Sequence, residues 1–118
     1  MPPMEFKVET RDESGVPVVA IHGSLSDDPI EAARDEVMRG LEGSPAYLIV
    51  DLTNVDYISS SGIGMLVGAQ KASRAASVGL VLCGLNADLQ ELFALTRLNQ
   101  IFTIAEDLKS WQQSVPTE

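Results

Sequence analysis

The chain has 118 residues, of which 45% are hydrophobic, a composition that fits one domain with a packed core. Its net charge of −9 at pH 7 disfavours binding to nucleic acids and to anionic membrane surfaces, since both attract cations. The single cysteine, Cys83, excludes an internal disulfide and a cysteine-based zinc site, and the single histidine, His22, weakens the case for histidine metal sites and catalytic triads.

Targeting signals are not evident in the sequence. No run of about 18 apolar residues is present that could span a membrane, and the N-terminal segment lacks the basic and apolar regions of a signal peptide. We therefore expect a cytoplasmic protein without a metal or other cofactor. We expect one domain over residues 1–118, with flexible ends at 1–4 and 114–118.

Hydrophobic patterning predicts the element order β-β-α-β-α-β-α-β-α. The strands are expected at residues 5–13, 16–22, 46–52, 78–84 and 101–105. The helices are expected from the cap cluster at 26–29 to Gly43, from 59–62 to about residue 77, from 86 to 98 and from 106 to 113. Residues 53–58 are expected to carry the chain across the sheet edge. This alternation predicts an α/β fold with a single mixed, mostly parallel sheet of about five strands and about four helices.

Apolar spacing within the helices predicts which side chains face the core. In the first helix these are Ile30, Ala33, Val37, Met38 and Leu41. In the third helix they are Leu89, Leu92, Phe93 and either Leu95 or Thr96, and in the last helix Leu108 and Trp111.

Three consecutive serines, Ser59, Ser60 and Ser61, stand where a strand gives way to a helix. Ligand and switch sites gather at this edge of α/β sheets. A helix N-terminus stabilises an anion, so a phosphoserine could be held there by its own helix. Local chemistry alone favours simple N-capping by Ser59 or Ser60, worth about 1 kcal/mol. Asp51, expected at a strand end, either orients this loop by accepting N–H bonds or has only a structural role.

Small residues form a stripe along the helix that follows the serines. Gly64, Gly68 and Ala72 recur every four residues. A helical glycine costs up to about 1 kcal/mol relative to alanine, so a packing gain is expected to offset it. Close packing on the sheet is the favoured explanation, and a docking surface beside Met65 is the alternative.

The segment 51–64 reads DLTNVDYISSSGIG and resembles the signature of STAS domains, above all that of anti-sigma factor antagonists. The family pattern is Asp-Leu-Ser/Thr, a short spacer, and then Asp/Ser-Ser-Ser/Thr/Ala-Gly-Leu/Ile. Segments 21–25 (IHGSL) and 81–93 also match the family, so the resemblance covers nearly the whole chain.

The resemblance implies a STAS fold and a partner-switching mechanism. The unphosphorylated form would bind an anti-sigma factor, itself a serine kinase of the histidine-kinase-like ATPase fold, and so free a sigma factor. Phosphorylation of Ser60 would switch this binding off, and a serine phosphatase would restore it. Because Ser59 replaces an aspartate of the pattern, Ser59 and Ser61 stay open as alternative acceptors. Ser26 stands where some members carry a partner-contacting aspartate, and Asp27 follows it.

These arguments predict a partner-binding surface rather than a catalytic centre. The expected contact residues are Ser26, Asp27, Asp51, Ser59, Ser61, Gly62, Gly64, Met65 and Gly68. A hydrolase is not expected, because a nucleophile elbow around Ser60 would need glycine where Ile58 stands.

Two other hypotheses remain open. The first is a free-standing STAS scaffold or a subunit of an ABC-type lipid transport or stress-signalling assembly, without phosphoswitching. The second is a small-molecule or nucleotide sensor that uses the same serine loop.

Overall fold

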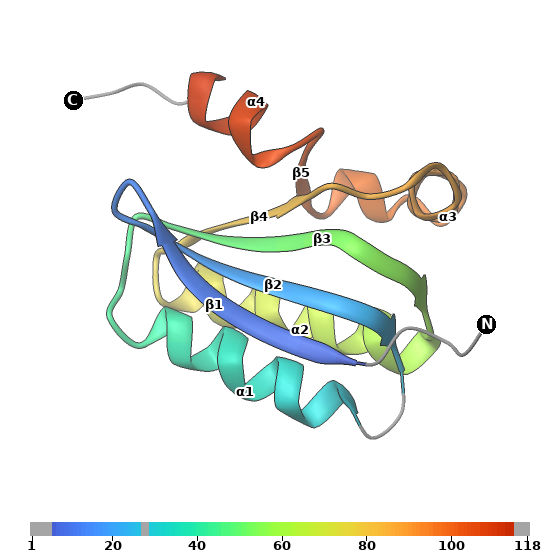
Figure 1. Ribbon diagram of the computed structural model, residues 1–118, viewed down its shortest axis with the longest axis horizontal. Coiled ribbons are helices and arrows are strands. Elements are labelled where there is room, and N and C mark those ends of the chain that lie inside the picture. Colours follow the sequence, from blue (N-terminus) through green and yellow to red (C-terminus); the bar gives the residue numbers. More distant parts are fainter. Residues whose placement is uncertain (1–5, 27–28, 115–118) are drawn as a thin grey trace.

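The computed structural model describes residues 6–26 and 29–114 (Figure 1). The elements are β1 (Lys7–Glu13), β2 (Val16–Leu25), α1 (Pro29–Leu41), β3 (Tyr47–Ile58), α2 (Ser60–Ala75), β4 (Gly79–Cys83), α3 (Ala87–Leu95), the 3₁₀ turn η1 (Leu98–Gln100), β5 (Thr103–Ala105) and α4 (Leu108–Ser114). The predicted element order is confirmed, with η1 as an addition. Residues 1–4 and 115–118, expected above to be flexible, lie outside the described ranges, and residue 114 ends α4. Within those ranges, no helix is long and apolar enough to cross a membrane.

The five strands form one sheet in the order β1-β2-β3-β4-β5. β1 and β2 are antiparallel, and the three other pairings are parallel, so the predicted mixed, mostly parallel sheet is confirmed. Helices α1 and α2 lie together on one face of the sheet, and α4 lies on the other (Figure 1). Parallel strands joined through helices end on the same side of a sheet. β2 and β3 end together at Leu25 and Ile58, whereas β4 ends earlier, opposite Asp51.

Two hydrophobic clusters hold the sheet and the helices together, because side chains alternate along a strand. Leu48 and Val50 of β3 face the larger cluster, which also contains residues of α1, α2 and α3. Ile49, between them, faces a smaller cluster on the opposite side with Val81, Cys83 and other residues. Both faces of the central strands are therefore buried, as expected for parallel strands covered by helices.

The prediction that residues 53–58 carry the chain across the sheet edge is wrong, because β3 continues to Ile58. Pairing with β4 ends at Asp51, whereas pairing with β2 goes on from Asn54 to Ile58. Two register shifts in this stretch leave the buried residues Leu52, Val55 and Ile58 three positions apart. That spacing hides the two-residue period by which a strand is recognised.

The third helix also ends earlier than expected. α3 stops at Leu95, and Arg97 adopts a left-handed conformation with φ of 61° before η1 begins. The hydroxyl of Thr96 donates to the carbonyl of Leu92 over 2.6 Å. The turn directs Leu98 into the core and leaves Leu95 76% exposed, so the expected inward position of Leu95 or Thr96 is wrong.

We expect Trp111 to hold α4 on the sheet, because a helix of seven residues has little stability of its own. Trp111 is buried and packs edge-to-face against Tyr47, with ring centroids 5.0 Å apart. Trp111→Ala should lower the free energy of unfolding by about 3–5 kcal/mol in urea titrations. The exposed neighbour Lys109 provides the control, since Lys109→Ala should change it by less than about 0.5 kcal/mol. Equal effects of the two substitutions would contradict this role of Trp111.

Candidate functional site

The serine loop, residues 59–61, lies at the common edge where β2 and β3 end. The last residue pair of the two strands is Leu25 and Ile58. The N–H of Ser59 donates to the carbonyl oxygen of Leu25 over 3.1 Å, and α2 begins at the next residue. The pairing of β2 with β3 therefore fixes where the serine loop stands.

Ser59 is the N-cap of α2, which confirms the capping prediction. Its hydroxyl accepts the N–H of Gly62 at 3.1 Å and donates to the carbonyl of Leu25 at 3.4 Å. The residue is half-buried. Its hydroxyl is thus already engaged with the backbone on both sides.

Ser60 and Ser61 are the first two residues of α2, and both are exposed. Neither hydroxyl has a hydrogen-bond partner among the residues that the structure describes. Both lie at the positive end of the helix dipole, where a negative group is stabilised. The geometry leaves these two serines open to chemistry in a way that Ser59 is not.

Gly62 and Met65, expected to contact a partner, are buried instead. A Cβ at Gly62 would collide with the carbonyl oxygen of Leu25 and come within 2.9 Å of Ile58 Cγ2. Met65 is 2% exposed and belongs to the larger core cluster. Both residues seat the helix against the strand ends and do not reach the surface, so their expected partner contact is corrected here.

The stripe of small residues has the opposite placement. Gly64 and Gly68 are exposed, and a Cβ at either position would meet no atom within 4 Å. The favoured explanation, close packing on the sheet, is therefore wrong for these two glycines. They give α2 a bare strip of backbone that runs away from the serine loop.

Two further polar contacts tie the loops of this edge together. The Ser24 hydroxyl donates to Asp56 Oδ1 over 2.9 Å and so joins the ends of β2 and β3. The Asn86 side chain caps α3 and donates to the carbonyl of Val55 over 3.4 Å. Sequence patterns had singled out Asn86 as a cap and Ser24 only as part of segment 21–25, and no local signal indicated their partners.

The predicted contacts before α1 are only partly described. Ser26 is half-buried and follows the last residue of β2. Asp27 lies outside the described residues. Asp56, which accepts the hydrogen bond from Ser24, is an exposed acid at the ends of β2 and β3.

Asp51 does not bond to the serine loop, so of the two roles left open for it, its contacts support the structural one. It lies in the middle of β3, eight residues before Ser59, which corresponds to about 26 Å of strand. Its carboxylate accepts the N–H and the hydroxyl of Thr53 at 3.0 and 2.5 Å, and Arg11 Nη2 donates to it at 3.3 Å. These bonds tie β1 to β3 at the point where β3 parts from β4.

The environment of Asp51 favours its charged form. Burial alone raises the pKa of this carboxyl, but the hydrogen bonds from Thr53 and the bond and charge of Arg11 outweigh burial, so the pKa lies below its ordinary value. Across the ladder, burial and then the Asp51 carboxylate raise the pKa of Cys83 to about 12. The thiol is therefore protonated at neutral pH and is not a nucleophile.

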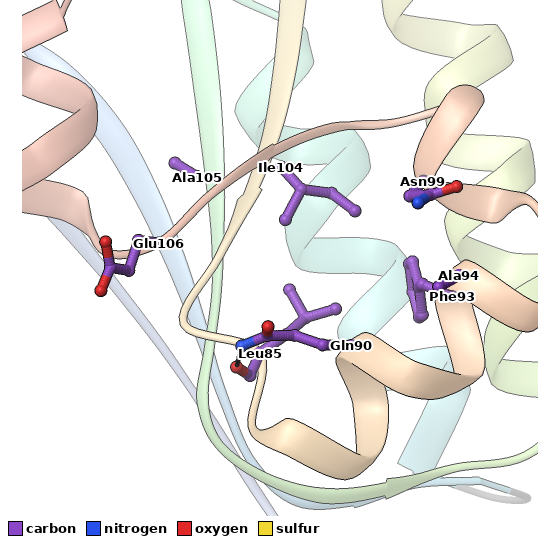
Figure 2. A pocket seen from close by; sticks show the side chains of 8 residues that line it. All are labelled: Leu85, Gln90, Phe93, Ala94, Asn99, Ile104, Ala105 and Glu106. Carbon is purple, nitrogen blue, oxygen red and sulfur yellow. Dashed lines mark hydrogen bonds between the residues drawn. The ribbon is translucent and has the colours of Figure 1, made fainter.

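A cavity of about 650 Å³ opens between α3, η1 and β5 (Figure 2). Its lining consists of Leu85, Gln90, Phe93, Ala94, Asn99, Ile104, Ala105 and Glu106. The Gln90 amide donates to the carbonyl of Leu85 over 2.8 Å, so its N–H group is already in use. No residue of the serine loop lines the cavity, which is therefore a separate feature. In the described part of the chain, no three His, Cys, Asp or Glu side chains are grouped to hold a metal ion.

Comparison with known proteins identifies what this arrangement resembles. The model of the STAS domain family matches residues 7–111. The anti-sigma-B factor antagonist of Listeria monocytogenes is 46% identical over 69 residues, which are 58% of this chain and 59% of the relative. The matched part thus spans less than two thirds of that relative's length.

Solved structures show the same fold. An anti-sigma factor antagonist from Mycobacterium paratuberculosis superposes with a TM-score of 0.83 at 20% identity, over 94% of each chain. The Bacillus cell fate determinant SpoIIAA in its phosphorylated form gives a TM-score of 0.67 at 17% identity, over 94% of this chain and all of the other. At these identities the likeness concerns the fold alone.

The contrast between the buried and exposed glycines of α2 predicts that the change from glycine to alanine has opposite effects on stability at the two kinds of position. Gly62→Ala should lower the free energy of unfolding by about 1–3 kcal/mol, because the new Cβ must displace the end of β2. Gly64→Ala, two residues on, should raise it by up to about 1 kcal/mol, because the space is open and alanine favours a helix. Chemical denaturation of both variants measures the difference, and destabilisation by Gly64→Ala would contradict the described placement of α2.

The lowered pKa of Asp51 predicts a pH-dependent loss of stability. The folded-state pKa lies below the unfolded value of about 3.9, so its contribution is present above that value and is lost as pH falls through the folded pKa. Asp51→Asn should therefore be less stable than wild type at pH 7, and this gap should narrow as the pH falls below about 4. Denaturation curves from pH 7 to pH 2.5 measure the gap, and a constant difference would show that the charge of Asp51 is not what stabilises the fold.

Proposed function

The chain belongs to the STAS domain family, and on this premise we propose that it is an anti-sigma factor antagonist that is switched off by phosphorylation of Ser60. In its unphosphorylated form it binds an anti-sigma factor and so frees a sigma factor. That partner is a serine kinase of the histidine-kinase-like ATPase fold, and a serine phosphatase reverses the modification. The chain itself is a binding protein and a kinase substrate rather than an enzyme, and it works in the cytoplasm.

The observation that carries this proposal is the exposed hydroxyl of Ser60, which has no hydrogen-bond partner within residues 6–26 and 29–114. The neighbouring Ser59 already uses its hydroxyl as a helix cap, which argues against Ser59 as the acceptor. Ser61 is as exposed as Ser60, so the choice between them rests on the family pattern. The names of the similar proteins, anti-sigma-B factor antagonist among them, support the role of anti-sigma factor antagonist.

Phosphorylation at this position changes the surface without requiring a new fold. A phosphate adds a charge of about −1.5 to −2 at neutral pH. The N-terminus of α2 stabilises that charge, so the helix remains formed. A partner that covers Ser60 would then face a bulky, strongly charged group in place of a small hydroxyl, and binding would be lost.

The proposed contact surface follows from exposure. It contains the exposed residues Ser60 and Ser61, the bare backbone strip at Gly64 and Gly68, and beside them the half-buried Ser26, which follows the end of β2. Asp51 is left out, because its side chain is 15% exposed and bonds to Arg11 and Thr53 in the middle of the sheet.

The first test is whether phosphate occurs on the native protein. The protein should be purified from growing and from stressed native cells and its serine-loop peptide examined by mass spectrometry. We expect a phosphate on Ser60 whose occupancy changes with the condition. Absence of phosphate in every condition would favour a scaffold or transport-assembly subunit instead.

Variants of the serine loop test the switch itself. Ser60→Asp should weaken binding to the kinase at least about tenfold, a loss of about 1.4 kcal/mol, while circular dichroism stays unchanged. Ser60→Ala should bind as wild type does and should not be released by ATP. Ser61→Ala is the matched control, because it removes an equally exposed hydroxyl and should still be phosphorylated and released. If the Ser60→Ala variant is still phosphorylated at a single site, the assignment of Ser60 as the acceptor is wrong.

A further inference from the structure

Tyr57 is a large hydrophobic residue left exposed beside the serine loop. Its exposed fraction is 57%, although the nearest apolar residues along β3, Val55 and Ile58, are buried. The other large hydrophobic residues with high exposure in the described part of the chain are Leu95 and Ile101, which lie in and after the α3 region. Tyr57 is therefore the exposed aromatic ring at the edge where the proposed switch is located.

The backbone under Tyr57 is held firmly. Tyr57 pairs with Ser24 in the ladder with β2, and the next residue, Ile58, is buried in the core. β4 pairs with β3 only as far as Asp51, so among the described elements no strand lies beside Tyr57 on that side. The hydroxyl of Tyr57 has no hydrogen-bond partner within residues 6–26 and 29–114. The ring is thus presented to solvent from the end of β3 that pairs with β2, and no described residue bonds to the hydroxyl at its tip.

Distance along the chain places Tyr57 within reach of anything that covers Ser60. Three residues span at most about 11 Å between Cα atoms. A standard protein interface covers about 800 Å² on each partner, which corresponds to a disc of radius about 16 Å. A footprint of this size centred on Ser60 is therefore wide enough to include Tyr57. Tyrosine is also among the residues that most often dominate binding energy at interfaces.

We propose that Tyr57 is the aromatic anchor for the protein that phosphorylates Ser60, and this inference rests on the proposed function. The partner offers an apolar pocket for the ring. The partner residues around that pocket are cationic or neutral, because the ends of β2 and β3 carry the exposed acid Asp56. Tyr57 is a binding residue and takes no part in the transfer of phosphate.

The test compares binding of wild type and variants to the serine kinase that phosphorylates this chain. Affinities are measured by calorimetry with the purified kinase and the full-length chain. Tyr57→Ala should weaken binding by about 30-fold or more, as expected for a hot-spot residue. Tyr57→Phe should lose only a few-fold, because it keeps the ring and gives up the hydroxyl. Leu95→Ala is the matched control, since Leu95 is still more exposed but lies on α3, and it should bind within twofold of wild type.

Folding is checked independently of binding. Because Tyr57 is exposed, Tyr57→Ala should unfold at a temperature within a few degrees of wild type. Should it unfold earlier, Tyr57→Gln provides the comparison, because its uncharged aliphatic stem replaces the ring at the surface and its weaker binding would give the same support.

The outcomes separate the two proposals. If wild type binds the kinase and Tyr57→Ala binds equally well, the anchor role is overturned and the proposed function stands. If no serine kinase both binds wild type and phosphorylates its serine loop, the anchor role and the proposed function are both overturned. If light scattering shows a wild-type dimer that Tyr57→Ala converts to a monomer, a second copy covers Tyr57 and the anchor role for the kinase is overturned.

Discussion

The carbonyl oxygen of Leu25 is the atom on which the geometry of the site depends. It accepts both the N–H and the hydroxyl of Ser59, and so it anchors the first residue before α2 to the end of β2. Its closeness to α2 leaves no room for a side chain at position 62, so glycine there is a steric requirement. Leu25 is itself fully buried, and the helix start is consequently attached to the hydrophobic core.

The three serines divide structural and chemical roles between them. Ser59 completes the hydrogen bonds of the helix end, which frees its two neighbours from that task. A modification at Ser60 would then act on the surface while the cap beside it stays intact. Such a switch needs no second conformation, since charge and bulk alone decide whether a partner can cover the site. The exposed glycines on the same helix are consistent with a partner that approaches the backbone closely.

Much of the fold could be predicted from sequence, because local signals and long-range packing agree in most elements. The caps at Ser59 and Asn86 and the apolar face of α1 are features of neighbouring residues, and these predictions are confirmed. The end of β3 could not be predicted, since its pairing with β2 shifts register twice and destroys the expected period. The role of Asp51 depends on Arg11, forty residues away, and the exposure of Gly64 depends on how α2 is rotated on the sheet. Neither can be read from a single segment.

The sequential order of the strands has a consequence for how the protein is made. Every strand pairs with the one synthesised just before it, so the sheet can grow outward from the first hairpin as the chain leaves the ribosome. The residues in direct contact with the serine loop at its start, Leu25 of β2 and Gly62 of α2, precede β4 in the chain. The local contacts of the loop therefore come from the part of the chain that is synthesised before β4. The core on which β2, β3 and α2 rest is completed only later, by residues of β4 and α3.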